Sequence, residues 1–267
     1  MSKSNEPILN KLFKDSNTYV EEAIEVNKEE FIKVVESRRS VRIYNDAKVK
    51  EEDMLQCLEL SLLSANSSNL QPWEFYWVRS PEKRAQMAAI CLGQNAAKTA
   101  QECVVIVVRK DLWRQRCDAV ITQQVALFKE VFGDPLGPAQ KRVLMYWEKL
   151  VPLLYRSGFG VLDVGKRMVA WLRGLRSPTP REVTSGHMLT SAHRSVALAS
   201  MTFMHSISAE GFDSCPLEGF DSRRLKALLG LPRGAQISMV VAIGKRVKKG
   251  VYGPRLRLPI ESVVYEV

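Results

Sequence analysis

The sequence has few histidines, few cysteines and no long apolar run. Its histidines, His187, His193 and His205, have no cysteine or carboxylate at zinc-ligand spacing, which argues against a transition-metal site. No segment approaches the roughly 18 consecutive apolar residues of a membrane span, and no apolar signal follows a basic start at the N-terminus. The five cysteines are widely spaced, as is typical of reduced, packed thiols. We therefore predict a cytoplasmic protein with no resident metal and no membrane partner.

Acidic residues are scarce relative to basic ones. The 267 residues include 39 Lys and Arg against 29 Asp and Glu, a formal net charge of +10, and 46% are hydrophobic. Such a chain can bury a sizeable core, and its charge suggests nucleic acid, an anionic membrane surface or a phosphorylated small molecule as partner. The excess lies in residues 109–190, with 14 basic and 7 acidic side chains, and in residues 240–267, with 6 and 2. Neither segment shows a basic run with interleaved aromatics or a known nucleic-acid motif, so nucleic acid is not expected.

Helical and strand patterns are mixed without strict alternation, which favours an α+β fold with a sheet covered by helices. Residues 1–27 read as an arm, and residues 109–190 are mostly helical in pattern with several breaks. The expected helices cover residues 29–36, a segment that starts near 51, 82–101 with a break near Gly93, 189–210 and 221–229. The expected strands cover residues 75–78, 103–108, a short stretch around Phe212, and 237–243.

Two basic segments are suited to bind a phosphate. Arg38, Arg39, Ser40 and Arg42 combine guanidinium groups with a hydroxyl donor where a helix meets a loop. A solvated arginine turn explains this cluster equally well when it is taken alone. Arg255 and Arg257, two residues apart in an extended segment, would point to the same side and could add a second pair of donors.

Two polar turns are suited to contact a flat heteroaromatic ring. Short amide and hydroxyl side chains lie between Asn66 and Trp73, although an ordinary loop of turn formers would look the same. Gly219 in the segment Pro216 to Asp221 permits close backbone approach to a ligand. The simpler interpretation of that segment is a helix entry with Asp221 as the N-cap.

Taken in order, these segments resemble the FMN-dependent nitroreductase family. The match runs over Arg38 to Tyr44, Ser64 to Phe75, Gly93-Gln94 before the valine-rich strand, Leu198 to Asp221, and Arg255 to Pro259. It covers residues 28–108 and 190–267. The resemblance implies a nitroreductase-like α+β fold, with a mostly antiparallel sheet flanked by helices, in an intertwined homodimer with two FMN sites at the interface.

The resemblance also implies roles for individual residues. It places the FMN phosphate and ribityl chain on Arg38, Arg39, Ser40 and Arg42, helped by Arg255 and Arg257. It places Gln94 at the pyrimidine edge of the flavin and the backbone of Glu218 and Gly219 beside the reactive N5. Ser67 and Asn69 would reach the flavin from the partner subunit.

The implied activity is electron transfer from NADH or NADPH, through flavin N5, to a nitroaromatic, a quinone or a similar small acceptor in ping-pong order. No residue is expected to act as a catalytic acid or base. The alternatives are reductive dehalogenation or flavin fragmentation on the same fold, or a non-catalytic flavin-binding protein. The sequence decides neither the acceptor nor the choice between NADH and NADPH.

Residues 109–190 depart from the family pattern as a divergent helical insertion. In this family the region lies over the open face of the flavin, so its aromatic residues are candidates for pocket lining, although helical packing is the simpler role. These residues are Trp113, Phe128, Tyr146, Trp147 and Tyr155. The Gly158 to Gly160 stretch has the wrong spacing for a dinucleotide loop and is expected to be a turn between helices.

Overall fold

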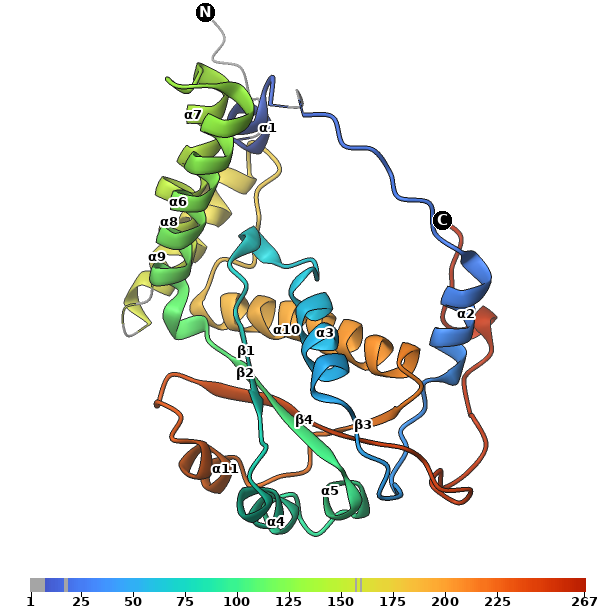
Figure 1. Cartoon of the computed structure of the whole chain (residues 1–267). Coiled ribbons are helices and arrows are strands. Elements are labelled where there is room, and N and C mark those ends of the chain that lie inside the picture. The colour runs from blue at the N-terminus through green and yellow to red at the C-terminus, as the bar shows by residue number, and fades with distance from the viewer. Residues whose placement is uncertain (1–7, 17–18, 157, 159) are drawn as a thin grey trace, which may run out of the picture.

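A four-stranded antiparallel sheet forms the centre of the computed structural model (Figure 1). The structure describes residues 8–16, 19–156, 158 and 160–267. The strands are β1 (Trp73–Trp77), β2 (Glu102–Val108), β3 (Asp213–Leu217) and β4 (Gln236–Gly244), in the order β1-β2-β4-β3. The predicted α+β class and antiparallel sheet are confirmed. The strand expected around Phe212 begins one residue later and runs on to Leu217.

The two central strands are buried on both faces. In β2, Val105 and Val107 belong to one core cluster, whereas Val104, Ile106 and Val108 belong to the other. Side chains alternate across a strand, so a run of β-branched residues supplies apolar groups to both layers at once. This explains why residues 103–108 lack the alternation of a half-exposed strand.

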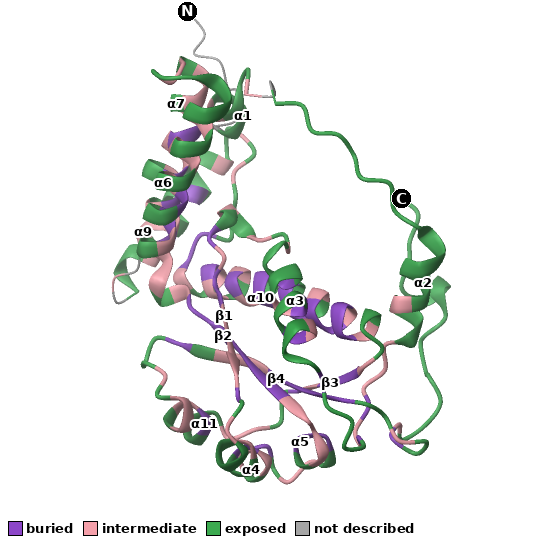
Figure 2. Cartoon of the chain, viewed as in Figure 1, coloured by how far each residue is buried: buried purple, intermediate pink, exposed green. Residues whose placement is uncertain are grey.

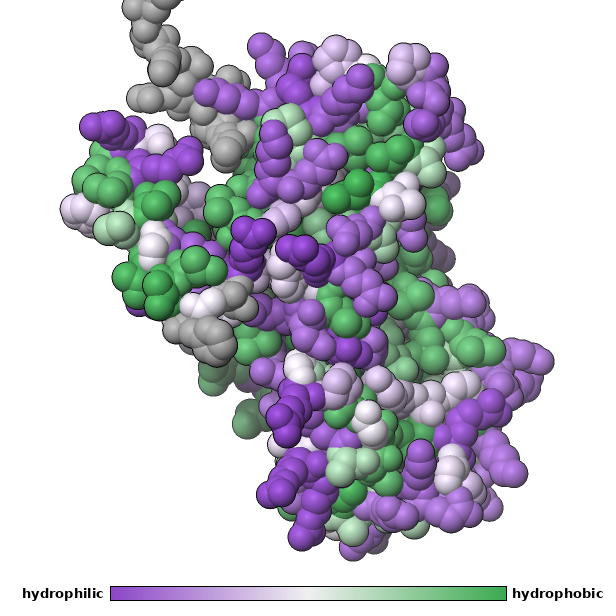
Figure 3. Space-filling model, turned by 90° about the vertical axis from the view of Figure 1, so that its left-hand side faces the viewer, coloured by the Kyte–Doolittle hydropathy of each residue, from purple (hydrophilic) through white to green (hydrophobic). Residues whose placement is uncertain are grey.

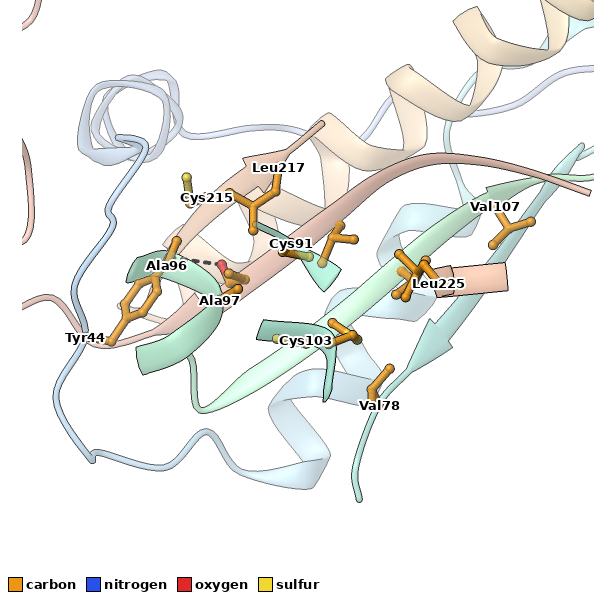
Figure 4. Packing of buried hydrophobic residues seen from close by; sticks show 14 of the residues in the cluster. Tyr44, Val78, Cys91, Ala96, Ala97, Cys103, Val107, Cys215, Leu217 and Leu225 are labelled. Atoms are coloured by element: carbon orange, nitrogen blue, oxygen red, sulfur yellow. Dashed lines mark hydrogen bonds between the residues drawn. The ribbon is translucent and has the colours of Figure 1, made fainter. Parts of the chain in front are cut away.

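Helices α4 (Pro81–Ile90), α5 (Asn95–Thr99) and α11 (Ser222–Leu229) cover one face of the sheet. The predicted break near Gly93 is confirmed, because α4 and α5 are separate helices with positive φ angles of 60° at Leu92 and 67° at Gly93 between them. Figure 4 shows this layer, in which the Tyr44 side chain reaches in from the edge. Its hydroxyl donates to the main-chain carbonyl groups of Val41 and Ala242, at 2.7 and 3.0 Å.

Helices α3 (Glu51–Leu62) and α10 (Ser185–Ala209) cover the other face. α10 starts four residues before the predicted Leu189, because the Thr184 side chain caps it by accepting from the His187 backbone amide. It is buried along its sheet-facing side, which Figure 2 shows in purple.

The insertion forms a separate bundle beyond the end of the sheet (Figure 1). It contains α6 (Trp113–Phe132), α7 (Pro138–Met145), the π-helix η3 (Tyr146–Leu150), α8 (Val151–Tyr155) and α9 (Val161–Gly174). Three short 3₁₀ helices of the described chain are η1 (Ser67–Asn69), η2 (Lys110–Leu112) and η4 (Ile260–Ser262). The predicted helical character of residues 109–190 is confirmed. Of the predicted turn at 158–160, Phe159 lies outside the described residues, and Gly160 has the positive φ of 83° that glycine tolerates before α9.

The N-terminal arm includes a helix that the sequence did not predict. α1 (Ile8–Phe13) packs on the insertion, where the Phe13 ring lies 5.8 Å from the Tyr146 ring. Residues 19–27 then run extended to α2 (Lys28–Ser37), and the C-terminus lies beside α2 (Figure 1). Residues 1–7 and 17–18 of the predicted arm lie outside the described residues.

Candidate functional site

The arginine cluster begins where α2 ends. The chain turns into an extended segment at Arg38, with φ −63° and ψ 118°. Ser40 then forms a parallel bridge with Ser214 of β3, and the Arg42 amide donates to the Gly250 carbonyl at 2.7 Å. The segment that contains the predicted phosphate-binding residues is therefore fixed against the sheet and the segment that follows β4.

The C-terminal segment joins this cluster from the opposite end of the sequence. The Arg255 guanidinium donates to the Arg38 carbonyl at 3.1 Å, and the Arg39 guanidinium donates to the Gly253 carbonyl at 2.7 Å. The Arg42 guanidinium lies over the Tyr252 ring, 5.1 Å from its centroid. Arginines more than 200 residues apart in sequence thus share one surface.

The cluster has an excess of positive charge. The pKa of Arg38 is lowered by burial and by the charges of Arg255, Arg257 and Arg39. Burial and the Arg38 charge also lower the pKa of His205. Among the residues that the structure describes, none of Arg38, Arg39, Arg42, Arg255 and Arg257 has a carboxylate oxygen within 4.0 Å. Cations held together without an anion form a natural site for a phosphate.

Gln94 and Gly219 are also neighbours. The Gln94 side-chain amide donates to the Gly219 carbonyl at 2.8 Å and to the Cys91 carbonyl at 3.1 Å. Glu218 and Gly219 are exposed, and a Cβ at Gly219 would lie 3.3 Å from that amide nitrogen. Asp221 caps α11 by accepting from the Arg224 amide, so the helix-entry interpretation of this segment also holds.

Tyr252 links these residues to the arginines. Its hydroxyl accepts from the Asn95 side chain at 3.1 Å, next to Gln94 in sequence, and its ring lies under Arg42. The phosphate-binding candidates and the ring-edge candidates therefore share one side of the molecule. A flavin mononucleotide, with a phosphate at one end and a polar ring edge at the other, fits this distribution of donors.

The Ser67 and Asn69 loop lies elsewhere in the same chain. The Ser67 amide donates to the Ser195 hydroxyl on α10 at 3.2 Å, whereas the arginine cluster lies near His205 on the same helix. Ten residues of helix separate these two positions by about 15 Å. One chain therefore does not bring Ser67 and Asn69 to the arginines, as expected if they serve the partner's site.

This loop is conformationally strained. Ser68, Asn69 and Gln71 have positive φ angles of 57°, 50° and 47°, a region that residues other than glycine seldom occupy. The Asn66 side chain holds the loop through two hydrogen bonds. It accepts from the Gln71 backbone amide at 2.8 Å and donates to Oδ1 of the Asn69 side chain at 3.3 Å. Strain of this kind is concentrated at functional sites.

Comparison with known proteins identifies the family. The Nitroreductase family model matches residues 35–245. The chain belongs to the nitroreductase family. The predicted family and its fold are thereby confirmed, and the match includes the insertion and every segment on which the resemblance rested except Arg255 to Pro259.

The names of two relatives include the expected electron donor, and one related structure contains the expected cofactor. The chain is 25% identical over 236 residues to YdgI of Bacillus subtilis, which carries an NAD(P)H nitroreductase name; the match covers 88% of this chain and 96% of that one. It is 29% identical over 227 residues to the NADH dehydrogenase of Thermus thermophilus, covering 85% and 91%. A nitroreductase structure from Exiguobacterium sibiricum, in complex with FMN, superposes with a TM-score of 0.62 at 23% identity, covering 92% and 99%.

The aromatic residues of the insertion pack mainly against each other, and Phe128 also lines a cavity of about 230 Å³ together with Phe132 and Val143. Trp147, Tyr155 and Val151 belong to one buried cluster, against which Trp113, Tyr146 and Phe128 pack. The Trp147 indole donates to the Ser68 carbonyl at 2.8 Å, and the Tyr155 hydroxyl forms a hydrogen bond with the Ser67 side chain. Helical packing, the simpler prediction, is correct for these residues within the single chain. They also fix the strained loop.

Several residues that support this candidate site were not predicted from the sequence. Tyr252 and Asn95 carried no recognisable motif. Asp213 accepts from the backbone and guanidinium of Arg246, which in turn donates to the Ser37 carbonyl at 3.1 Å at the end of α2. The sequence signal for this ion pair was an aspartate at the start of one strand, Asp213, and an arginine just after another, Arg246.

The cysteines behave as the sequence predicts. All five cysteines are buried and free, and burial raises the pKa of Cys91 to about 11 and that of Cys103 to about 12. Such thiols carry little thiolate at neutral pH and are poor nucleophiles. Over the described part of the chain, no helix is both long and apolar enough to cross a bilayer.

Proposed function

We propose that this chain binds FMN and transfers electrons from NADH or NADPH to a small oxidised acceptor, such as a nitroaromatic compound or a quinone. The observation that supports this proposal most is that five arginines meet beside the Gln94 and Gly219 pair, with no carboxylate oxygen of the described residues within 4.0 Å of them. Family membership supports the same cofactor, and the donor appears in the names of the relatives.

The residues of this site have separable tasks. Arg38, Arg255 and Arg257 would hold the phosphate, and Arg39, Ser40 and Arg42 would complete its surroundings and those of the ribityl chain. Gln94 would orient the pyrimidine edge, and the Gly219 backbone would approach the N5 side, where glycine leaves space. Positive charge at this end of the molecule stabilises an anionic reduced cofactor. When bound, FMN supplies the hydride chemistry, and a single open face would make donor and acceptor bind in turn.

A second copy of the chain would complete the site. Large apolar side chains are exposed on the extended arm, on α2, on the middle of α10 and on the C-terminal segment, where a monomer would leave them in water. Representative residues are Val20, Ile24, Phe31, Leu198, Met201, Leu256 and Leu258. We therefore propose a homodimer in which residues 28–267 form the FMN-binding domain, the arm at 1–27 wraps the partner, and Ser67 and Asn69 contact the partner's flavin.

Cofactor content and reduction kinetics test the proposed activity. The purified protein should be yellow, NADH or NADPH should bleach it rapidly, and a nitroaromatic or quinone should restore the colour. A protein that stays colourless after FMN is added contradicts the proposal. Slow bleaching without acceptor turnover would instead indicate flavin fragmentation or another chemistry on this fold.

Two further measurements test the oligomer and the location. Light scattering after gel filtration should give twice the chain mass of 30.2 kDa, and a monomer with bound FMN would contradict the shared site. Fractionation of the source cells tests the predicted cytoplasmic location.

A further inference from the structure

Helix α9 (Val161–Gly174) has an unusual orientation in the insertion, because its polar side faces the protein. Asp163 accepts from the Ser185 amide at 3.0 Å. Lys166, which is seven-eighths buried at its side chain, donates to the Leu154 carbonyl at 2.7 Å and lies 3.9 Å from Asp163. Ala170 is the one buried residue among those that the structure describes in this helix. The stripe 163, 166, 170 follows helical spacing and fixes α9 by polar contacts.

The opposite side of α9 presents apolar side chains to solvent. Val164, Met168, Trp171 and Leu172 are 69%, 59%, 58% and 51% exposed, and Leu175 just beyond the helix is 65% exposed. These positions also follow helical spacing, so the helix is amphipathic with its apolar side outward. We call these five residues the α9 face. Figure 3 shows the side of the molecule that carries the insertion, on which hydrophobic side chains gather in patches among hydrophilic ones.

Between residues 161 and 181, every exposed charged side chain is an arginine. Arg167, Arg173 and Arg176 are exposed along its length. Asp163 is the only carboxylate between residues 161 and 181, and it is turned inward against Lys166. A two-fold contact between two copies of this face would oppose arginine to arginine. The charge pattern thus favours an anionic partner with an apolar layer beneath its charges.

We propose that the α9 face binds the surface of an anionic lipid bilayer. A helix with a broad apolar side, flanking arginines and a tryptophan lies in the plane of a membrane interface, with its apolar residues among the upper acyl chains. The arginines then meet lipid headgroups, which attract each basic residue near the surface. The prediction of no membrane partner rested on the absence of a spanning segment, and interfacial binding needs no such segment.

This binding is independent of the proposed reductase activity. α9 is fixed by contacts within the insertion, and the arginine cluster lies beyond the other end of α10. Loss of FMN would therefore leave lipid binding unchanged, and failure of the one proposal would not remove the other.

Vesicle sedimentation of the full-length protein tests the proposal. The protein should pellet with vesicles of phosphatidylglycerol and phosphatidylcholine at low salt and much less with phosphatidylcholine alone. Each arginine removed from the face should weaken partitioning about fivefold, so the triple variant R167Q/R173Q/R176Q should remain in the supernatant. The triple variant R223Q/R224Q/R233Q changes the net charge equally in and just after α11, and it should still pellet.

A second pair of variants tests the apolar contribution. M168S/L172S/L175S should abolish pelleting while far-UV circular dichroism stays unchanged, because these side chains lie in solvent. Trp171 emission should shift to the blue on binding, and W171F should lose that shift. No pelleting with anionic vesicles, or pelleting that survives both α9 variants, overturns the proposal. A change of oligomeric state in M168S/L172S/L175S would show that a second copy covers this face, and would overturn it as well.

Discussion

The two regions near α10 that carry candidate site residues differ in the kind of group they present, since one is charged and the other is neutral. Near His205, five arginines converge from segments far apart in sequence, and backbone carbonyls rather than carboxylates hold them. Near Ser195, a short loop with three strained residues is held by neutral hydrogen bonds and by the insertion. The first region offers charge to a ligand, and the second offers a rigid set of neutral donors and acceptors.

This difference indicates how the site is divided between subunits. Charge acts over several ångströms, so the cation region can recruit a phosphate without close fit. Neutral hydrogen bonds require contact within about 3.2 Å, so the loop needs fixed geometry. We infer that the arginines supply most of the affinity and that the loop adjusts the orientation of the ring. Variants of the two regions should therefore differ in magnitude and in kind.

Loss of the arginines should have the largest effect. In R38A/R255A, two charged contacts to phosphate worth about 2 kcal/mol each disappear, which weakens FMN binding about a thousandfold. Flavin absorbance after gel filtration and fluorescence titration would measure this. R223A, an exposed arginine on α11, serves as the control and should bind FMN normally. Full occupancy in R38A/R255A would show that these arginines do not bind the phosphate.

The ion pair of Asp213 and Arg246, which supports the arginine cluster, should contribute to the free energy of unfolding. Asp213 is buried, and D213A leaves Arg246 without its carboxylate, which should lower the free energy of unfolding by about 2 to 3 kcal/mol because Arg246 is partly exposed. In the loop region, S195A removes the neutral hydrogen bond from the Ser67 amide and the local one to the Ser191 carbonyl, and should cost only about 1 kcal/mol. Urea denaturation of both variants measures the comparison. Equal losses would mean that the two regions are held alike.

A substitution in the loop should have a smaller effect on binding. N69D keeps the shape and tolerates the positive φ of Asn69, but it replaces an amide donor by a negative charge. FMN affinity should fall about tenfold, the equivalent of one lost hydrogen bond. The reduction rate at saturating FMN should fall as well, because ring orientation changes. An unchanged affinity and rate would remove Asn69 from the site.

The titration of His205 should give the smallest signal. Burial and Arg38 lower its pKa in the folded protein, so this residue contributes stability above its unfolded pKa of about 6.5 that is lost as the pH falls below that value. H205Q should remove this part of the acid dependence. Phosphate bound beside Arg38 should raise the pKa of His205 back toward its ordinary value, as NMR titration with and without FMN would show. A pKa that FMN leaves unchanged would place the phosphate elsewhere.

Much of the fold was accessible from sequence, because local patterns determine it. The β-branched run at 103–108 predicts a buried strand, and Gly93 marks the break between α4 and α5. The start of α10 was missed because the capping box that begins at Thr184 has His187 at its reciprocal third position rather than the usual Glu or Gln. α1 was missed because six residues with scattered apolar groups give little helical signal, and their packing on Tyr146 is a tertiary effect.

The site was predictable to the extent that its residues carry recognisable motifs. The arginines and Gln94 stand in segments that resemble the family, and the structure brings them to one side of the molecule. Tyr252, Asn95 and Asp213 support them through contacts between distant segments, which no local pattern encodes. The outward apolar side of α9 was also hidden, since amphipathic periodicity does not say which side faces the protein.

The most direct test of the shared site is complementation between two defective chains. R38A/R255A and N69D, co-expressed with different affinity tags and purified as the mixed dimer, place both defects in one of the two sites and none in the other. In an FMN titration, one site for every two chains of the mixed dimer should fill with wild-type affinity, whereas both sites of the N69D homodimer should bind about tenfold more weakly and both sites of the R38A/R255A homodimer about a thousandfold more weakly. A mixed dimer with no site of wild-type affinity would contradict a site built from two subunits.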